Sequence, residues 1–112
     1  MDGAREAFAH RATLVAHADT DLRAPGGAVT EELCGSLDHQ PPCPLAAHFT
    51  SAERGGDGRV AVRVLFACQP ADEPLVRTRI DDALARSWDL VASGPDAVRD
   101  SEAAHATRLV TS

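Results

Sequence analysis

The stretch from Arg59 to Cys68 constrains the fold of this chain more than any other segment. Every second residue in it is apolar, and the positions between them include Arg59 and Arg63. Because the side chains of a β-strand alternate between its two faces, this period of two predicts a half-buried strand. The residues expected on the buried face are Val60, Val62, Val64, Phe66 and Cys68.

The residues before this strand predict that it belongs to a hairpin. Residues 54–58 read Arg-Gly-Gly-Asp-Gly, and glycine reaches the positive backbone angles that a tight turn needs. The preceding segment, residues 45–53, also alternates, so a turn about Gly56 and Asp57 would pair the two strands. The pairs expected across this hairpin are Phe49 with Val64, Ala47 with Phe66, and Leu45 with Cys68.

The remaining segments predict two helices and two further strands. Residues 8–16 alternate, although their alanines would equally allow a helix. Val29 and Leu33 mark the inner side of a short helix over 30–33. After Asp72, a plausible N-cap, apolar residues recur at helical spacing as far as Trp88, and a last strand begins there. The apolar side of that longer helix comprises Val76, Ile80, Ala83 and Leu84.

The C-terminal residues have a weaker pattern. Gly94-Pro95 is expected to end the last strand, because proline cannot donate to a β-ladder. Residues 96–104 predict a short helix, and residues 107–110 predict either a closing strand or a tail. Residues 95–112 therefore form either part of the domain or a loosely packed C-terminal extension.

The expected order is strand, helix, strand, strand, helix, strand, which is the split βαββαβ arrangement of ferredoxin-like folds. We therefore predict one α+β domain over residues 1–112, with an antiparallel sheet and the helices on one face. A chain of 112 residues buries roughly two thirds of its unfolded surface, which is enough for a single core.

The composition limits the cellular compartment and the classes of partner that we expect for this chain. All eleven basic residues are arginine, and lysine is absent, which indicates a GC-rich bacterial gene. The formal charge of -6 disfavours nucleic acid and anionic membranes as partners. The sequence shows neither a signal-peptide pattern nor an apolar run long enough to span a bilayer, so we expect a cytoplasmic protein.

Cysteine and histidine recur at Cys34, His39, Cys43 and His48, at intervals of five, four and five residues. Thiolate and imidazole are ligands that zinc favours, so this segment is a candidate zinc site. His48 would point to the strand face opposite Ala47 and Phe49, and this handicaps it as a ligand. Cys68, which the hairpin carries toward Cys43, is its rival as the fourth ligand.

Some features of the residues around these candidate ligands support the prediction of a zinc site, and others weaken it. Prolines at positions 41, 42 and 44 restrict the loop, and Asp38 could fix an imidazole tautomer or bind the metal itself. The spacing lacks the tight Cys-x2-Cys pair of most structural zinc sites. Buried structural cysteines with exposed histidines, and redox or disulfide chemistry, therefore remain alternatives.

Three functions follow from these patterns. The first is a small cytoplasmic bacterial metal-binding protein that holds zinc. The second is a metal-free, ferredoxin-like interaction module or homodimer, for which Arg63 and Leu65 on the outward side of the hairpin provide the surface. The third is a small accessory enzyme in which Cys43 acts as nucleophile beside His39 or His48.

Overall fold

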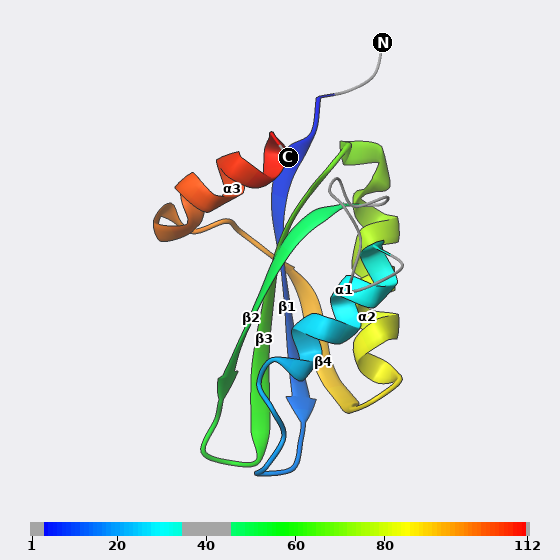
Figure 1. Cartoon of the computed structure of the whole chain (residues 1–112), viewed down its shortest axis with the longest axis vertical. Coiled ribbons are helices and arrows are strands. Elements are labelled where there is room, and N and C mark those ends of the chain that lie inside the picture. Colours follow the sequence, from blue (N-terminus) through cyan, green and yellow to red (C-terminus); the bar gives the residue numbers. More distant parts are fainter. Residues whose placement is uncertain (1–3, 35–45, 112) are drawn as a thin grey trace.

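The computed structural model describes residues 4–34 and 46–111, with Cys34 described by its backbone alone. These residues form four strands and three α-helices (Figure 1). In chain order the elements are β1 (Glu6–Val15), α1 (Ala24–Cys34), β2 (Ala47–Arg54), β3 (Arg59–Cys68), α2 (Glu73–Ala85), β4 (Asp89–Asp96) and α3 (Ala103–Val110). Single 3-10 turns at Pro70–Asp72 and Asp100–Glu102 precede α2 and α3.

The strands form one antiparallel sheet in the order β2-β3-β1-β4. The single α+β domain and the order of its first six elements are as predicted. The third helix is an addition, so the chain does not follow the strict βαββαβ pattern. Residues 107–110, predicted as a strand or a tail, belong to this helix.

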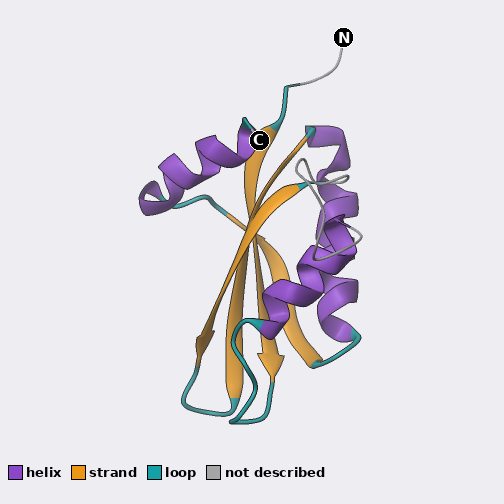
Figure 2. Cartoon of the chain, in the orientation of Figure 1, coloured by secondary structure: helices purple, strands orange, loops and turns teal. Residues whose placement is uncertain are grey.

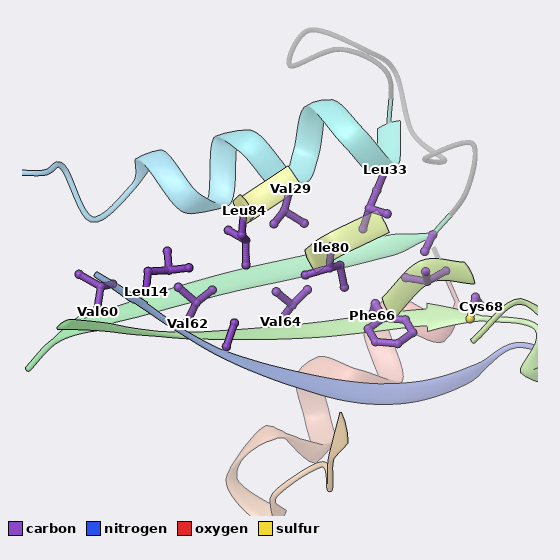
Figure 3. Close-up of a cluster of buried hydrophobic side chains, with 13 residues drawn as sticks. Leu14, Val29, Leu33, Val60, Val62, Val64, Phe66, Cys68, Ile80 and Leu84 are labelled. Atoms are coloured by element: carbon purple, nitrogen blue, oxygen red, sulfur yellow. The ribbon is translucent and has the colours of Figure 1, made fainter. Parts of the chain in front are cut away.

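One face of the sheet, here called the first face, packs against α1 and α2 (Figure 2). The alternating residues of β3 lie there with Leu14 of β1, and α1 and α2 contribute Val29, Leu33, Ile80 and Leu84 (Figure 3). Phe66, at 0% exposure, has its ring 5.5 Å from that of Phe8. This continuous apolar layer is the main core of the protein.

The opposite, second face is covered by α3 over part of its area (Figure 1). Leu109 of α3 packs against Leu65 and three alanines there. The prediction that all helices lie on one face is therefore wrong, and so is the outward placement of Leu65, which is 4% exposed. At the end of β3 both alternating sets are apolar, and such a segment needs cover on both faces. The three alanines are Ala9, Ala47 and Ala67.

The hairpin forms as predicted, but its register differs by one residue. Phe49 pairs with Leu65 instead of Val64, and Ala47 pairs with Ala67. The loop is three residues long and centred on Asp57, with Gly58 at φ 80°. A positive φ after a type I turn is typical of three-residue hairpin loops, whereas the prediction assumed a two-residue turn. Since side chains alternate, this shift moves Ala47 and Phe49 to the second face.

Two elements are longer than the sequence indicated. Helix α1 begins at Ala24 with Pro25 in its first turn, where the missing N–H of proline costs nothing. Strand β4 continues through Gly94 and Pro95 to Asp96. It lies at the edge of the sheet, where proline is tolerated. The pairing of β4 with β1 shifts in register between Thr13 and Leu14.

Candidate functional site

The residues of the predicted zinc site fall largely outside the part of the chain that the structure describes. His39 and Cys43, together with Asp38, lie between residues 35 and 45, and the side chain of Cys34 is likewise outside it. Within residues 4–34 and 46–111, no three histidine, cysteine, aspartate or glutamate side chains gather as metal ligands would. Of the five predicted ligands, the structure therefore places the side chains of His48 and Cys68 only.

His48 lies on β2 and points toward α1. Its Nε2 is 3.0 Å from Thr30 Oγ1, and its Nδ1 is 3.1 Å from the carbonyl oxygen of Ala46. Since Nδ1 must donate to that carbonyl, Nε2 accepts from the Thr30 hydroxyl. Both ring nitrogens are thus engaged, and the Nε2 contact joins β2 to α1. His48 does face away from Ala47 and Phe49, as its place in the strand predicted.

Cys68, the last residue of β3, is a buried free thiol with 1% exposure. Burial raises its pKa to about 11, and the nearby Asp72 and Glu73 carboxylates add to the effect. The thiol therefore stays protonated at neutral pH and packs as an apolar group. Because Ala47 pairs with Ala67, Cys68 stands beside Ala46, where residues 35–45 join β2.

A second candidate site lies on the second face, beyond the part that α3 covers. We call this area the open half-face. It contains a hollow of about 240 Å³, and its floor carries small side chains from three neighbouring strands. Ala61 pairs with Thr13, and Thr13 pairs with Ala92. The polar residues that line the hollow are Arg11, Thr13, Ser51, Glu53, Arg63, Asp96 and Arg99.

Arg63 anchors the segment before α3 to this face. It donates to both carboxylate oxygens of Glu102, at 2.6 and 2.7 Å, to Asp96 at 2.8 Å and to the Ala97 carbonyl at 2.7 Å. These hydrogen bonds from Arg63 lower the pKa of Glu102 to about 2. They also raise the pKa of Arg63. The Arg63 guanidinium is therefore engaged by two carboxylates and one carbonyl group.

Arg11 and Arg99 differ from Arg63 in this respect. Arg11 stands directly opposite Arg63 on the neighbouring strand, and neither it nor Arg99 has a carboxylate within 4.0 Å among the described residues. The Arg99 backbone N–H donates to Glu102 Oε1 at 2.8 Å, whereas its guanidinium acts on Asp96 and Glu102 only over a longer range. The Arg11 guanidinium lies over Gly94, where a Cβ would stand 3.5 Å from Nη2. The hollow thus presents two guanidinium groups without ion pairs.

A buried polar network on the first face is structural. His10, at 2% exposure, has its Nδ1 3.1 Å from Arg77 and its Nε2 2.8 Å from Asp81. Ser93 of β4 donates to the other oxygen of Asp81. Because an arginine can only donate, the imidazole accepts at Nδ1 and donates at Nε2. The network ties β1 and β4 to α2.

The sequence contained only a partial signal for the open half-face. Arg63 was assigned to the outward side of its strand, and Arg11 alternates with the buried residues of β1. Arg99 lies 88 positions after Arg11 and had no pattern that joined them. Their convergence depends on how far α3 extends over the sheet, which is a tertiary property.

Comparisons of the chain with family models, curated protein sequences and solved structures give no match. In the described part of the chain, no helix combines the length and the apolar character needed to cross a membrane.

Proposed function

We propose that this chain is a small binding module that recognises an acidic ligand on its open half-face. The observation that carries the proposal is the pair of guanidinium groups, Arg11 and Arg99, that line one hollow without a carboxylate partner among the described residues. Guanidinium groups bind carboxylates and phosphates through paired, charge-assisted hydrogen bonds. The first six elements would form a ferredoxin-like unit, and α3 would be an addition that walls one side of the surface.

The contrast with other arginines of the chain supports this assignment. Arg63 is held by two carboxylates, Arg79 and Arg86 share Glu32, and Arg77 pairs with Glu73. In a chain of net charge -6, acidic side chains are in excess. Arginines that stay unpaired beside a concave, small-residue floor therefore favour recognition of an external anion over a role in the fold.

The test is amide mapping of citrate binding, with heteronuclear NMR spectra recorded at constant ionic strength. We expect the shifts to cluster on residues 11–13, 51–53, 61–63 and 96–99, which line or flank the hollow. The double variant Arg11→Gln/Arg99→Gln should lose at least about tenfold in affinity, since two charge-assisted contacts disappear. The matched control, Arg79→Gln/Arg86→Gln, removes the same charge from α2 and its C-cap. It should stay within about twofold of the unmodified protein, since these groups lie outside the hollow.

Three outcomes would contradict the proposal. Citrate-induced shifts of amides over the whole surface would indicate unspecific attraction. Both double variants could weaken binding equally, which would indicate an effect of net charge. A dimer by light scattering, with the open half-face protected from solvent exchange, would favour the homodimer over an acidic ligand.

Zinc binding is a second candidate, which we propose on a separate observation. Cys68 stands beside Ala46, at the end of the segment that contains His39 and Cys43, and α1 ends at Cys34 on the other side of that segment. This arrangement supports Cys34, His39, Cys43 and Cys68 as one ligand set, with His48 excluded because both of its nitrogens are engaged.

Elemental analysis of protein purified without chelator tests this candidate. We expect one zinc per chain, released by Cys34→Ser/Cys43→Ser. Cys68→Ala should weaken zinc retention less, because its thiol has to lose a proton whose pKa is raised to about 11. His48→Gln is the matched control and should retain the metal. Metal-free native protein, or metal retained by the double variant, would exclude the site.

A further inference from the structure

The hollow on the open half-face carries charges of both signs, and this property narrows the class of ligand. Arg11 and Arg99 line it together with the Glu53 carboxylate. Glu53 lies on β2, the edge strand, whereas Arg11 lies on β1, and β3 separates them. An acidic ligand that fills the hollow therefore meets an attractive side and a repulsive side.

The floor between these two sides offers hydrogen-bonding groups but little bulk. Ala61 pairs with Glu53 on one side and with Thr13 on the other. Ser51 pairs with Arg63 at the neighbouring position of the sheet. The Thr13 and Ser51 hydroxyls can donate or accept, and so can meet a neutral polar group of a ligand. The hollow is thus floored by small and hydroxyl side chains.

The size of the hollow limits the ligand to a small molecule. Its volume of about 240 Å³ is below the range of about 300–1,000 Å³ for sites that take drug-sized ligands. A polymeric acid would have to lie across the surface and would leave the hollow itself empty.

We propose that the hollow binds a small carboxylic acid that carries a hydroxyl or ammonium group at its other end. The carboxylate lies between Arg11 and Arg99, and the donor group of the ligand reaches the Glu53 carboxylate. This inference rests on the proposed function, since it takes the open half-face as the recognition surface. It adds the ligand class and the orientation, which Glu53 fixes by rejecting a second anionic group.

The acids 4-hydroxybutyrate, 4-aminobutyrate and succinate form a matched set of probes for this inference. All three are four-carbon acids, and succinate carries a second carboxylate where the other two carry a hydroxyl or ammonium donor. By calorimetry at constant ionic strength and neutral pH, we expect 4-hydroxybutyrate and 4-aminobutyrate to bind at least about fivefold more tightly than succinate. A contact with a charged hydrogen-bond partner accounts for a difference of that size.

Two variants separate this inference from the proposed function. Glu53→Gln should bring the three affinities together and strengthen succinate, because it removes the repulsion and the charged acceptor. Glu31→Gln on α1 removes the same charge outside the hollow and should change none of them by more than about twofold. Succinate binding as tightly as 4-hydroxybutyrate, at amides of the open half-face, would overturn the ligand class and leave the proposed function standing. Failure of all three acids and of citrate to bind there would overturn both.

Discussion

The two faces of the sheet are built from the same four strands and serve different purposes. The first face is mainly apolar, with the His10 network and the His48 contact as its polar members, and is covered by two helices. The second face is apolar only where α3 covers it, and beyond Leu65 it turns to small and charged residues. Alternation along a strand lets one sequence specify a core on one side and a polar surface on the other. The first face therefore provides most of the buried apolar contacts, and the second face carries the surface proposed for recognition.

Phe66→Ala should give the largest loss of stability, because it empties the centre of the first face. Phe66 is fully buried against Phe8 and the two helices. Large-to-small changes at such sites cost about 3–5 kcal/mol. Urea denaturation followed by circular dichroism measures the loss. A cost below that of the Leu109 variant described next would reverse the assignment of the two faces.

Leu109→Ala should be the most costly single change on the second face and still cost less than Phe66→Ala. Leu109 anchors α3 but remains 8% exposed and packs mostly against alanines. We expect a loss of about 2 kcal/mol, at the low end for a buried leucine. The same denaturation experiment applies, and hydrogen exchange should show faster opening of α3 than of α2. Equal exchange in the two helices would show that both faces unfold as one unit.

Acid should weaken the attachment of the α3 segment through Glu102. The Arg63 hydrogen bonds lower the pKa of Glu102 from 4.5 to about 2. A depressed pKa stabilises the fold above about pH 4.5, and this contribution is lost as the pH falls toward 2. Glu102→Gln should remove a pH-dependent contribution on the order of 1 kcal/mol after allowance for solvent screening.

The measurement for Glu102 is stability against pH between 6 and 2 for three proteins. The unmodified chain should lose stability more steeply than Glu102→Gln. Glu31→Gln, which changes the same residue type on α1 where no ion pair forms with another described residue, should follow the unmodified chain. If the Glu102 variant keeps the full acid slope, the Arg63 ion pairs do not stabilise α3.

Arg11→Gln should have the smallest effect on stability. Arg11 forms no ion pair with the described residues and lies opposite another arginine, so its removal should change stability by less than about 0.5 kcal/mol. The matched change Arg63→Gln should be clearly destabilising, since it breaks the contacts with Glu102, Asp96 and Ala97. A large loss for Arg11→Gln would show that this residue serves the fold.

The regular parts of the fold were predictable because local periodicity determines them. The strand over Arg59–Cys68 and the inward residues of α2 follow directly from periods of two and 3.6. The hairpin register was not predictable from the sequence, because the glycines allow a turn of either two or three residues. Helix α3 was only partly predicted. Its position on the second face depends on the burial of Leu65 and Ala67 beneath it.

The candidate sites differ in the same way. The zinc prediction arose from residues close together in sequence, and three of its five members, Cys34, His39 and Cys43, lack described side chains. The open half-face joins Arg11 and Arg99 from opposite ends of the chain. Sequence spacing cannot reveal such a site, because the contact depends on sheet order and on the point where α3 stops covering the strands.

The three-residue loop between β2 and β3 limits how this chain can change in length. Inserting one residue at Asp57 would turn Phe49 and Ser51 toward the helices and send Thr50 and Ala52 to the other side. Inserting two residues would leave every side chain on its present face. Related chains should therefore vary in loop length here by even steps, or offset an odd step by a bulge in β2. This short turn thus fixes which side chains of β2 face the open half-face. Evolution can alter the proposed binding surface only at those positions of the strand.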